Sequence, residues 1–323
     1  MLKDKKELLM EQLRSYQGKG KKYDFVVSFS GGKDSTYIAN LLKQTGFERV
    51  LLLTVDNGVE EEIFLDYVSD VAKKIGYDHY IIKPNLDNFR VAIKTMIEEK
   101  TFMKYDSNPI CFFCTEFMVA LSKQYAMDEE IPVLLHGMSP EQFHLGFTNK
   151  MFELKDKTFL RNQRFSLQIM NQGQQQMYES IQKEELYQTK REIKEFIDFL
   201  YIERPGVNVI YPYLFIEYNI EQIKQVIEKD LGWKNIYGVR NDQYITSGCE
   251  LIRILGFMQG KVDGLQLHEN KEIENNYKDG IVSDAAYEFY SQQLKFDESI
   301  ELTKHQKEII NDMDLWDYLN IEK

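Results

Sequence analysis

Residue types suited to binding a phosphate group are gathered in one stretch, Ser28-Phe29-Ser30-Gly31-Gly32-Lys33-Asp34-Ser35. Two adjacent glycines let the backbone bend sharply and approach a ligand closely. Successive backbone N–H groups at the start of a helix form an anion site, to which serine hydroxyls add donors and Lys33 adds a positive charge. The stretch therefore predicts a site for an anionic group.

The elements on either side must hold this stretch in place. Before it, Asp24-Phe25-Val26-Val27 is short, apolar and rich in β-branched and aromatic residues, which predicts a buried strand. After it, Ile38, Leu41 and Leu42 have helical spacing, and Gly46 ends the predicted helix. The stretch is thus interpreted as a strand–turn–helix junction. The alternative is an ordinary Gly-Gly turn without a ligand.

The string S-G-G-K-D-S after a strand resembles the pyrophosphate loop (PP-loop) of the N-type ATP pyrophosphatases. It is not a Walker A loop, which needs four residues between its first glycine and a Gly-Lys pair. The superfamily includes GMP synthetases, tRNA thiolation enzymes, sulfur-inserting enzymes and sugar amidotransferases. The resemblance implies that ATP is cleaved between its α- and β-phosphates with the help of Mg²⁺. A carbonyl-type oxygen becomes adenylylated and pyrophosphate leaves.

The same resemblance implies roles for single residues of the loop. Lys33 and the loop amides would stabilise the departing pyrophosphate, and Asp34 would orient the metal ion, so both are catalytic candidates. The nucleotide-binding candidates in and beside the loop are Ser28, Ser30, Gly31, Gly32, Lys33, Asp34 and Ser35.

Strands and helices alternate through the first 150 residues, with further strands predicted at Arg49–Val55, Tyr80–Ile82 and Ile131–Leu135. This alternation predicts a doubly wound, mainly parallel α/β sheet. The resemblance implies the fold of the adenine nucleotide α-hydrolases, followed here by a helical C-terminal region. In such sheets the ligand lies beyond the carboxyl ends of the strands.

Two more strand ends supply nucleotide-binding candidates, namely Thr54 and Asp56 after the second strand and Gly137 after the fourth. Asp56-Asn57-Gly58 matches the common D-x-G turn of the superfamily. The residues after Gly137 depart from the G-x-N-x-D-D pattern that several members carry. An aspartate such as Asp56 is also a common turn former, which is the alternative interpretation.

The chain has three cysteines, Cys111, Cys114 and Cys249. The first two form a C-x-x-C turn, which can place both sulfurs on one metal ion or cluster. Ser247 can cap a helix, which would leave Cys249 in the first turn with a lowered thiol pKa. Three cysteines are too few for a disulfide framework.

One C-x-x-C and one distant cysteine resemble a subset of sulfur-transferring PP-loop enzymes. In these, three cysteines hold a [4Fe-4S] cluster with one iron open to bind sulfide. The resemblance implies that Cys111, Cys114 and Cys249 are the cluster ligands. Three alternatives stay open: a zinc site with a fourth ligand, a redox C-x-x-C with a persulfide on a catalytic Cys249, and ordinary buried cysteines.

The leading functional hypothesis is therefore ATP-dependent sulfur transfer from a sulfide or persulfide donor. The second is an amidotransferase that takes ammonia from a partner glutaminase, because residues 76–84 look similar to sugar amidotransferases. The third is a nucleotide sensor without catalysis. The acceptor is a small molecule or a tRNA, and the net charge of −12 favours the small molecule.

Four regions are predicted: an N-terminal helix (1–22), the PP-loop domain (23–150), an irregular lid or insertion (151–190) and a helical region completing the substrate side (191–323). Asn171–Gln176 lacks a buried stripe and is expected to open easily. The N-terminus lacks a signal-peptide core. No apolar run is close to the length of about 20 residues that a membrane-spanning helix needs. A cytoplasmic homo-oligomer with no membrane association is expected.

Overall fold

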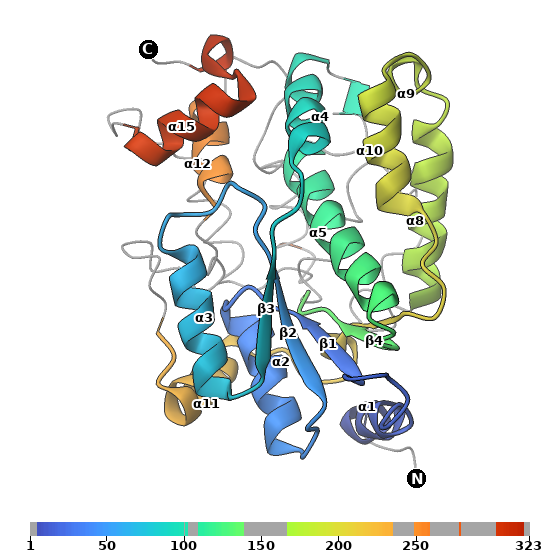
Figure 1. Ribbon diagram of the computed structural model, residues 1–323, viewed down its shortest axis with the longest axis vertical. Helices are drawn as coiled ribbons and strands as arrows, with labels where there is room; N and C mark the ends of the chain where they lie inside the picture. The colour runs from blue at the N-terminus through green and yellow to red at the C-terminus, as the bar shows by residue number, and fades with distance from the viewer. Residues whose placement is uncertain are drawn as a thin grey trace.

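The computed structural model describes residues 5–99, 101–102, 109–138, 167–234, 249–258, 278 and 302–319. In this part of the chain, parallel strands form one sheet in the order β3-β2-β1-β4-β5 (Figure 1). The strands are β1 (Phe25–Ser28), β2 (Val50–Val55), β3 (Asp78–Ile82), β4 (Val133–Leu135) and β5 (Asn208–Ile210). The predicted doubly wound α/β fold is confirmed.

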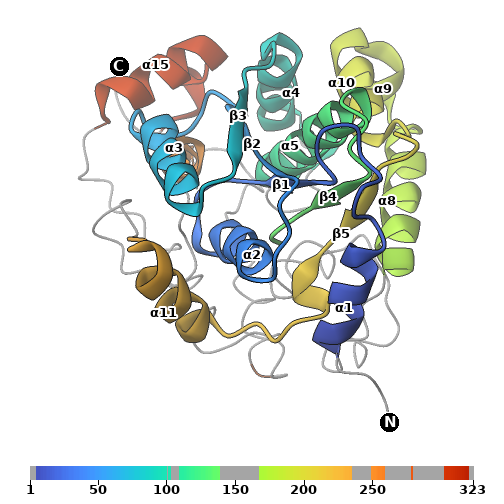
Figure 2. The ribbon, with the colours of Figure 1, turned by 60° about the horizontal axis from the view of Figure 1, so that its bottom comes forward.

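Helices cover both faces of this sheet. Figure 2 shows α2 and α11 on one face and α4 and α5 on the other. The helices are α1 (Lys5–Arg14), α2 (Lys33–Gln44), α3 (Phe64–Ile75), α4 (Asp87–Glu98), α5 (Pro109–Asp128), α8 (Leu167–Ile181), α9 (Glu185–Thr189), α10 (Arg191–Tyr201), α11 (Ile220–Leu231), α12 (Glu250–Met258) and α15 (Lys304–Met313), with 3₁₀ turns η2 (Pro212–Leu214) and η3 (Trp316–Tyr318).

The central strands are apolar on both faces because successive side chains point to opposite sides of the sheet. Val27 and Leu52 pack in the cluster formed with α2, α3 and α11. Their neighbours Val26 and Leu51 pack on the other face, beside Ala126 of α5. This explains why the strands appear in the sequence as continuous apolar runs.

The strand order places the PP-loop at the centre of the molecule. β1 pairs with β2 on one side and with β4 on the other, so the connections run in opposite directions from this point. A crevice opens at such a switch point, beyond the carboxyl ends of the strands. The PP-loop follows β1 and Gly137 follows β4, so both lie at the carboxyl ends of neighbouring strands at this switch point.

Three expectations need correction. The C-x-x-C cysteines lie in the first turns of the 20-residue helix α5, not on a turn. Its apolar residues surround the helix without an amphipathic stripe, so periodicity did not reveal it. Residues 167–181 and 185–189, expected to be irregular, form α8 and α9. The short edge strand β5 was not foreseen.

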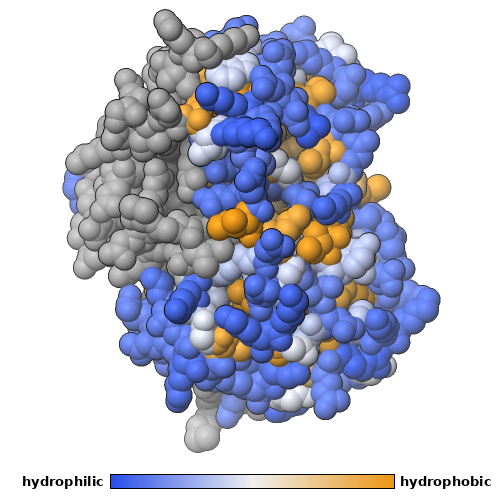
Figure 3. All heavy atoms as spheres, turned by 60° about the vertical axis from the view of Figure 1, so that its left-hand side comes forward, coloured by the Kyte–Doolittle hydropathy of each residue, from blue (hydrophilic) through white to orange (hydrophobic). Residues whose placement is uncertain are grey.

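The surface and the remaining expectations complete the description. One face of the molecule is mostly hydrophilic, with apolar side chains gathered near its middle (Figure 3). No helix in the described ranges is long and apolar enough to span a membrane. Ser247 and residues 151–166 of the predicted lid lie outside the described residues.

Candidate functional site

Gly31 is the loop residue whose backbone requires glycine. Its φ is +69°, in the left-handed region, and an added Cβ would lie 3.2 Å from Tyr67 Cε1 and 3.3 Å from Val68 Cγ2. Gly32, by contrast, caps α2 with a φ of −67°, which any residue adopts. Of the two glycines, Gly31 is therefore the one that the backbone conformation and the close neighbours require.

The outer side of the loop is firmly anchored through the carbonyl oxygen of Gly31. This oxygen accepts hydrogen bonds from Trp233 Nε1 at 2.9 Å, Thr36 Oγ1 at 3.0 Å and the Tyr67 hydroxyl at 3.1 Å. Trp233 is almost fully buried. These bonds hold the turn in shape before any ligand arrives, which is the preorganisation that electrostatic catalysis needs.

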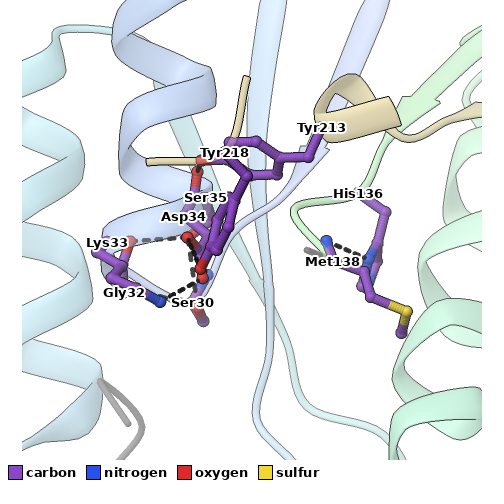
Figure 4. A network of polar contacts seen from close by, with 9 residues as sticks. All are labelled: Ser30, Gly32, Lys33, Asp34, Ser35, His136, Met138, Tyr213 and Tyr218. Atoms are coloured by element: carbon purple, nitrogen blue, oxygen red, sulfur yellow. Dashed lines mark hydrogen bonds and ion pairs between the residues drawn. The ribbon is translucent and has the colours of Figure 1, made fainter. Parts of the chain in front are cut away.

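The inner side of the loop is only weakly bonded. Ser30 N donates to Ser35 Oγ at 3.3 Å, the two serine hydroxyls are 3.3 Å apart, and Gly32 N donates to Ser30 Oγ at 3.4 Å (Figure 4). These distances are longer than the usual range for such bonds. The amides and hydroxyls can therefore turn to a phosphate at small cost, at the N-terminus of α2.

Lys33 and Asp34 form an ion pair at the start of α2. Lys33 Nζ lies 2.7 Å from Asp34 Oδ2, and the lysine side chain is only 2% exposed. The Tyr218 hydroxyl donates to Asp34 Oδ1 at 3.1 Å, and the Tyr213 hydroxyl donates to the Asp34 carbonyl at 3.0 Å (Figure 4). The segment after β5 thus positions the two charged loop residues.

The loop after β4 touches the PP-loop directly. A Cβ on Gly137 would lie 3.2 Å from Ser35 N, so a side chain here would press on the first turn of α2. Next to it, His136 Nδ1 accepts a hydrogen bond from Met138 N at 3.2 Å. Burial, assisted by the charge of Lys123, lowers the pKa of His136 to about 4. The imidazole is therefore neutral, with its proton on Nε2.

The candidates after β2 shape the crevice through their own hydrogen bonds. The Thr54 hydroxyl donates to Phe29 O at 2.6 Å and lies 2.8 Å from His79 Nε2, so it is fully engaged in the core. Asp56 Oδ1 accepts from Gly58 N at 3.1 Å, which makes an Asx turn. The turn-forming role of Asp56 is confirmed, and nucleotide binding by Thr54 and Asp56 stays a prediction.

Two of the cysteines, Cys114 and Cys249, contact residues 57–60, the turn after β2. Asn57 Nδ2 donates to Cys114 Sγ at 3.7 Å. Cys249 forms an antiparallel bridge with Glu60, next to the 2.8 Å hydrogen bond from Glu250 N to Val59 O. The fold therefore brings a residue far along the chain to the turn that contacts the C-x-x-C helix.

A metal-ligand arrangement is nevertheless not formed by these side chains. Within the described ranges, no group of three His, Cys, Asp or Glu residues could hold a metal ion. Burial chiefly, with help from Cys111 and Glu60, raises the pKa of the Cys114 thiol well above its usual range. As arranged, Cys114 is a neutral thiol, and binding a metal ion or cluster would require it to lose its proton.

Sequence reasoning missed Glu60, a carboxylic acid beside these cysteines. Its Oε2 atom is buried and has no hydrogen-bond partner among the residues that the structure describes. Burial raises the pKa of Glu60 to about 7, assisted by the neighbouring acids Glu61 and Glu250 and opposed by Asn57. It was missed because it lies in a run of three glutamates, which suggests a solvated surface.

The S-G-G-K-D-S string follows the central strand of a parallel, doubly wound sheet and opens a helix at its switch point. The strand–turn–helix junction expected for the loop is therefore present, at the place in the sheet where a phosphate would bind. Residues 23–126 match the model of a family of unknown function, DUF7411. No curated protein matches the sequence.

Similar solved structures include three PP-loop proteins. The U34-tRNA thiolase NcsA of Methanococcus maripaludis, solved with its [4Fe-4S] cluster, is 15% identical, with a TM-score of 0.42 over 92% of this chain and 81% of that one. The NMN synthetase of Francisella tularensis is 13% identical, with a TM-score of 0.41 over 93% and 94%. A predicted tRNA methyltransferase subunit of Methanocaldococcus jannaschii is 17% identical, with a TM-score of 0.33 over 63% and 73%. Likeness this distant assigns no activity.

Proposed function

We propose that the protein uses ATP to adenylylate a carbonyl-type oxygen of an acceptor and then transfers sulfur to the activated carbon. One observation carries the first step. The PP-loop is anchored on its outer side at Gly31 O and weakly bonded on its inner side, so its donors are fixed in place and available to phosphate oxygens.

In that step the acceptor oxygen attacks the α-phosphorus of ATP. The bond from this phosphorus to the oxygen bridging to the β-phosphate breaks, and pyrophosphate leaves with the bonding electrons. The loop amides and Lys33 stabilise the negative charge that grows on the leaving group. Lys33 turns from Asp34 to the phosphates, which frees the Asp34 carboxylate to orient Mg²⁺. Bound Mg²⁺ supplies further neutralisation of charge.

In the second step the sulfur attacks the activated carbon and AMP leaves with the bonding electrons. If this is the outer sulfur of a persulfide, a second cysteine thiol then attacks the inner sulfur, which breaks the S–S bond, leaves the outer sulfur on the product and forms a disulfide. Cys111, Cys114 and Cys249 are the candidates to carry this sulfur, on a [4Fe-4S] cluster or as a persulfide. The contacts of Cys114 and Cys249 with residues 57–60 support the proposal. Glu60, close to Cys114, is suited to exchange a proton near neutral pH.

The competing proposal is amide or amidine formation with ammonia from a partner. It uses the same activated intermediate and needs no thiolate. The buried, free thiol of Cys114 is compatible with this alternative. The two proposals therefore differ in the second step alone.

The test is a product analysis with ATP and Mg²⁺, followed by an analysis of protein purified without oxygen. Wild-type protein is expected to release AMP and pyrophosphate, and ADP with phosphate would contradict the first step. Bound iron and acid-labile sulfide, or a persulfide on Cys249, are expected for sulfur transfer. Protein that lacks all of these would leave the amidotransferase as the better proposal.

A further inference from the structure

Polar side chains from α5, α8, α10 and the end of β4 meet beyond the carboxyl ends of β4 and β5. We name this group the α5 polar cluster; its members are Glu116, Lys123, Gln174, Tyr201 and His136. Gln174 Nε2 donates to both carboxylate oxygens of Glu116 at 3.2 Å. Glu116 interacts electrostatically with Tyr201 and Lys123, and Lys123 does so with His136.

Several donor groups of this cluster have no hydrogen-bond acceptor or ion-pair partner in the described part of the chain. The Tyr201 hydroxyl is buried and has no hydrogen-bond partner. Lys123 has no carboxylate within ion-pair distance among the described residues. His136 has its Nδ1 engaged by Met138, which leaves Nε2–H as a donor. A buried polar group without a partner is costly, so a folded protein that keeps one calls for an explanation.

The cluster lies next to the nucleotide site. His136 and Gly137 are adjacent in the loop after β4, and Gly137 lies so close to the PP-loop that an added Cβ would be 3.2 Å from Ser35 N. Side chains of a helix lean toward its N-terminus, so Lys123 reaches toward the turn of α5 that holds Glu116. The Glu116, Lys123, Tyr201 and His136 side chains are half-buried, neither sealed in the core nor free on the surface. This is where a second substrate would meet an α-phosphate held by the loop.

We propose that the α5 polar cluster binds the acceptor, and that the acceptor is a small oxygen-rich molecule with an anionic group, a carboxylate or a phosphate. Lys123 pairs with the anionic group, while Tyr201 and His136 donate to oxygens of the same molecule. Glu116, held by Gln174, accepts from a hydroxyl or N–H group. The identification of the bound molecule as the acceptor rests on the proposed function. The binding of an anionic, oxygen-rich molecule by the cluster does not depend on it.

The test is labelling with pyridoxal 5′-phosphate, whose aldehyde condenses with an uncharged lysine amine as water leaves. Borohydride then reduces the imine, and mass spectrometry identifies the labelled lysines. Burial and Arg204 lower the pKa of Lys123, which favours the reaction. We expect labelling of Lys123 to be faster than with pyridoxal, which lacks the phosphate. Lys94, paired with Asp314 on the surface, is the control. Its ratio of rates with the two reagents gives their intrinsic difference, since pyridoxal is largely closed to a cyclic hemiacetal, and the ratio at Lys123 should be about tenfold larger.

Competitors and variants complete the test. Inorganic phosphate and acetate are added as competitors, and the stronger of the two identifies the anionic group. In the Y201F variant, phosphate and acetate should slow the labelling of Lys123 less than they do in the wild type. The melting temperature should not fall, because the Tyr201 hydroxyl has no partner to lose among the described residues. The proposal is overturned by an unlabelled Lys123, or by the same ratio of rates at Lys123 and Lys94. Gly31→Ala separates the two proposals, since it should stop pyrophosphate release and leave the labelling of Lys123 unchanged.

Discussion

At the residue scale, Gly31 combines a strained backbone with close neighbours. Its φ of +69° and the contacts at 3.2 and 3.3 Å leave no room for a side chain. Gly31→Ala is expected to lower the free energy of unfolding by about 1–3 kcal/mol and to weaken ATP binding at least about tenfold. Denaturant unfolding and calorimetric titration with ATP measure the two effects.

Gly46 is the matched control for this substitution. Its φ is +84°, but no atom lies within 4 Å of an added Cβ and the residue is remote from the loop. Gly46→Ala should cost stability through the backbone alone and leave ATP affinity unchanged. Equal losses of ATP affinity in both variants would show that the effect is global rather than local.

His136 makes a second prediction at this scale, because its folded pKa of about 4 lies below the usual 6.5. At pH above 6.5 the ring is neutral in both states. As the pH falls from 6.5 to about 4, the unfolded chain takes up a proton that the folded chain refuses, so stability is lost. For this half-buried ring the loss is about 1–3 kcal/mol.

The comparison of wild type with His136→Asn isolates this contribution. The Asn carbonyl can still accept from Met138 N, and the side chain does not titrate. Urea unfolding above pH 6.5 and near pH 4 should show a smaller loss in the variant. An identical loss in both proteins would mean that His136 is protonated in the folded state.

At the element scale, α8 replaces the lid that composition suggested. Its Met177 and Ile181 are buried, and the Tyr178 hydroxyl donates to Asp198 Oδ1 at 2.8 Å. Because these contacts join α8 to the core, amides 177–181 are expected to exchange with solvent as slowly as those of α10. Exchange as rapid as at the first turn of α1 would restore the lid interpretation.

At the scale of the whole molecule, the three cysteines depend on two chain segments meeting at residues 57–60. If sulfur transfer is the second step, Cys249→Ala should lose it entirely, because no other thiol replaces this one. Pyrophosphate release should persist, since the PP-loop is untouched. Iron and sulfide content, persulfide content and pyrophosphate are measured on the same preparations. A variant that keeps the sulfur-carrying group and the transfer would rule out the three-cysteine hypothesis.

The sequence by itself determined what is local in this protein. Val26 and Leu51 lie in runs apolar enough to be buried on both faces, so the strands and their parallel order were predictable. Gly31 and Lys33 belong to one short stretch of sequence, so the strand–turn–helix junction and its anion site were predictable too. Local propensity failed where no periodic pattern exists, as in α5, whose apolar residues surround the helix.

Only the tertiary structure decided which distant residues complete the site. Trp233 and Tyr218 reach the loop from 202 and 184 residues away, and neither carries a local pattern that marks it as part of a phosphate site. The meeting of Cys249 with Glu60 follows from packing of α12 against the turn after β2. Glu116 and Tyr201 interact because α5 and α10 pack against each other. Such contacts depend on how elements pack, which spacing along a chain does not encode.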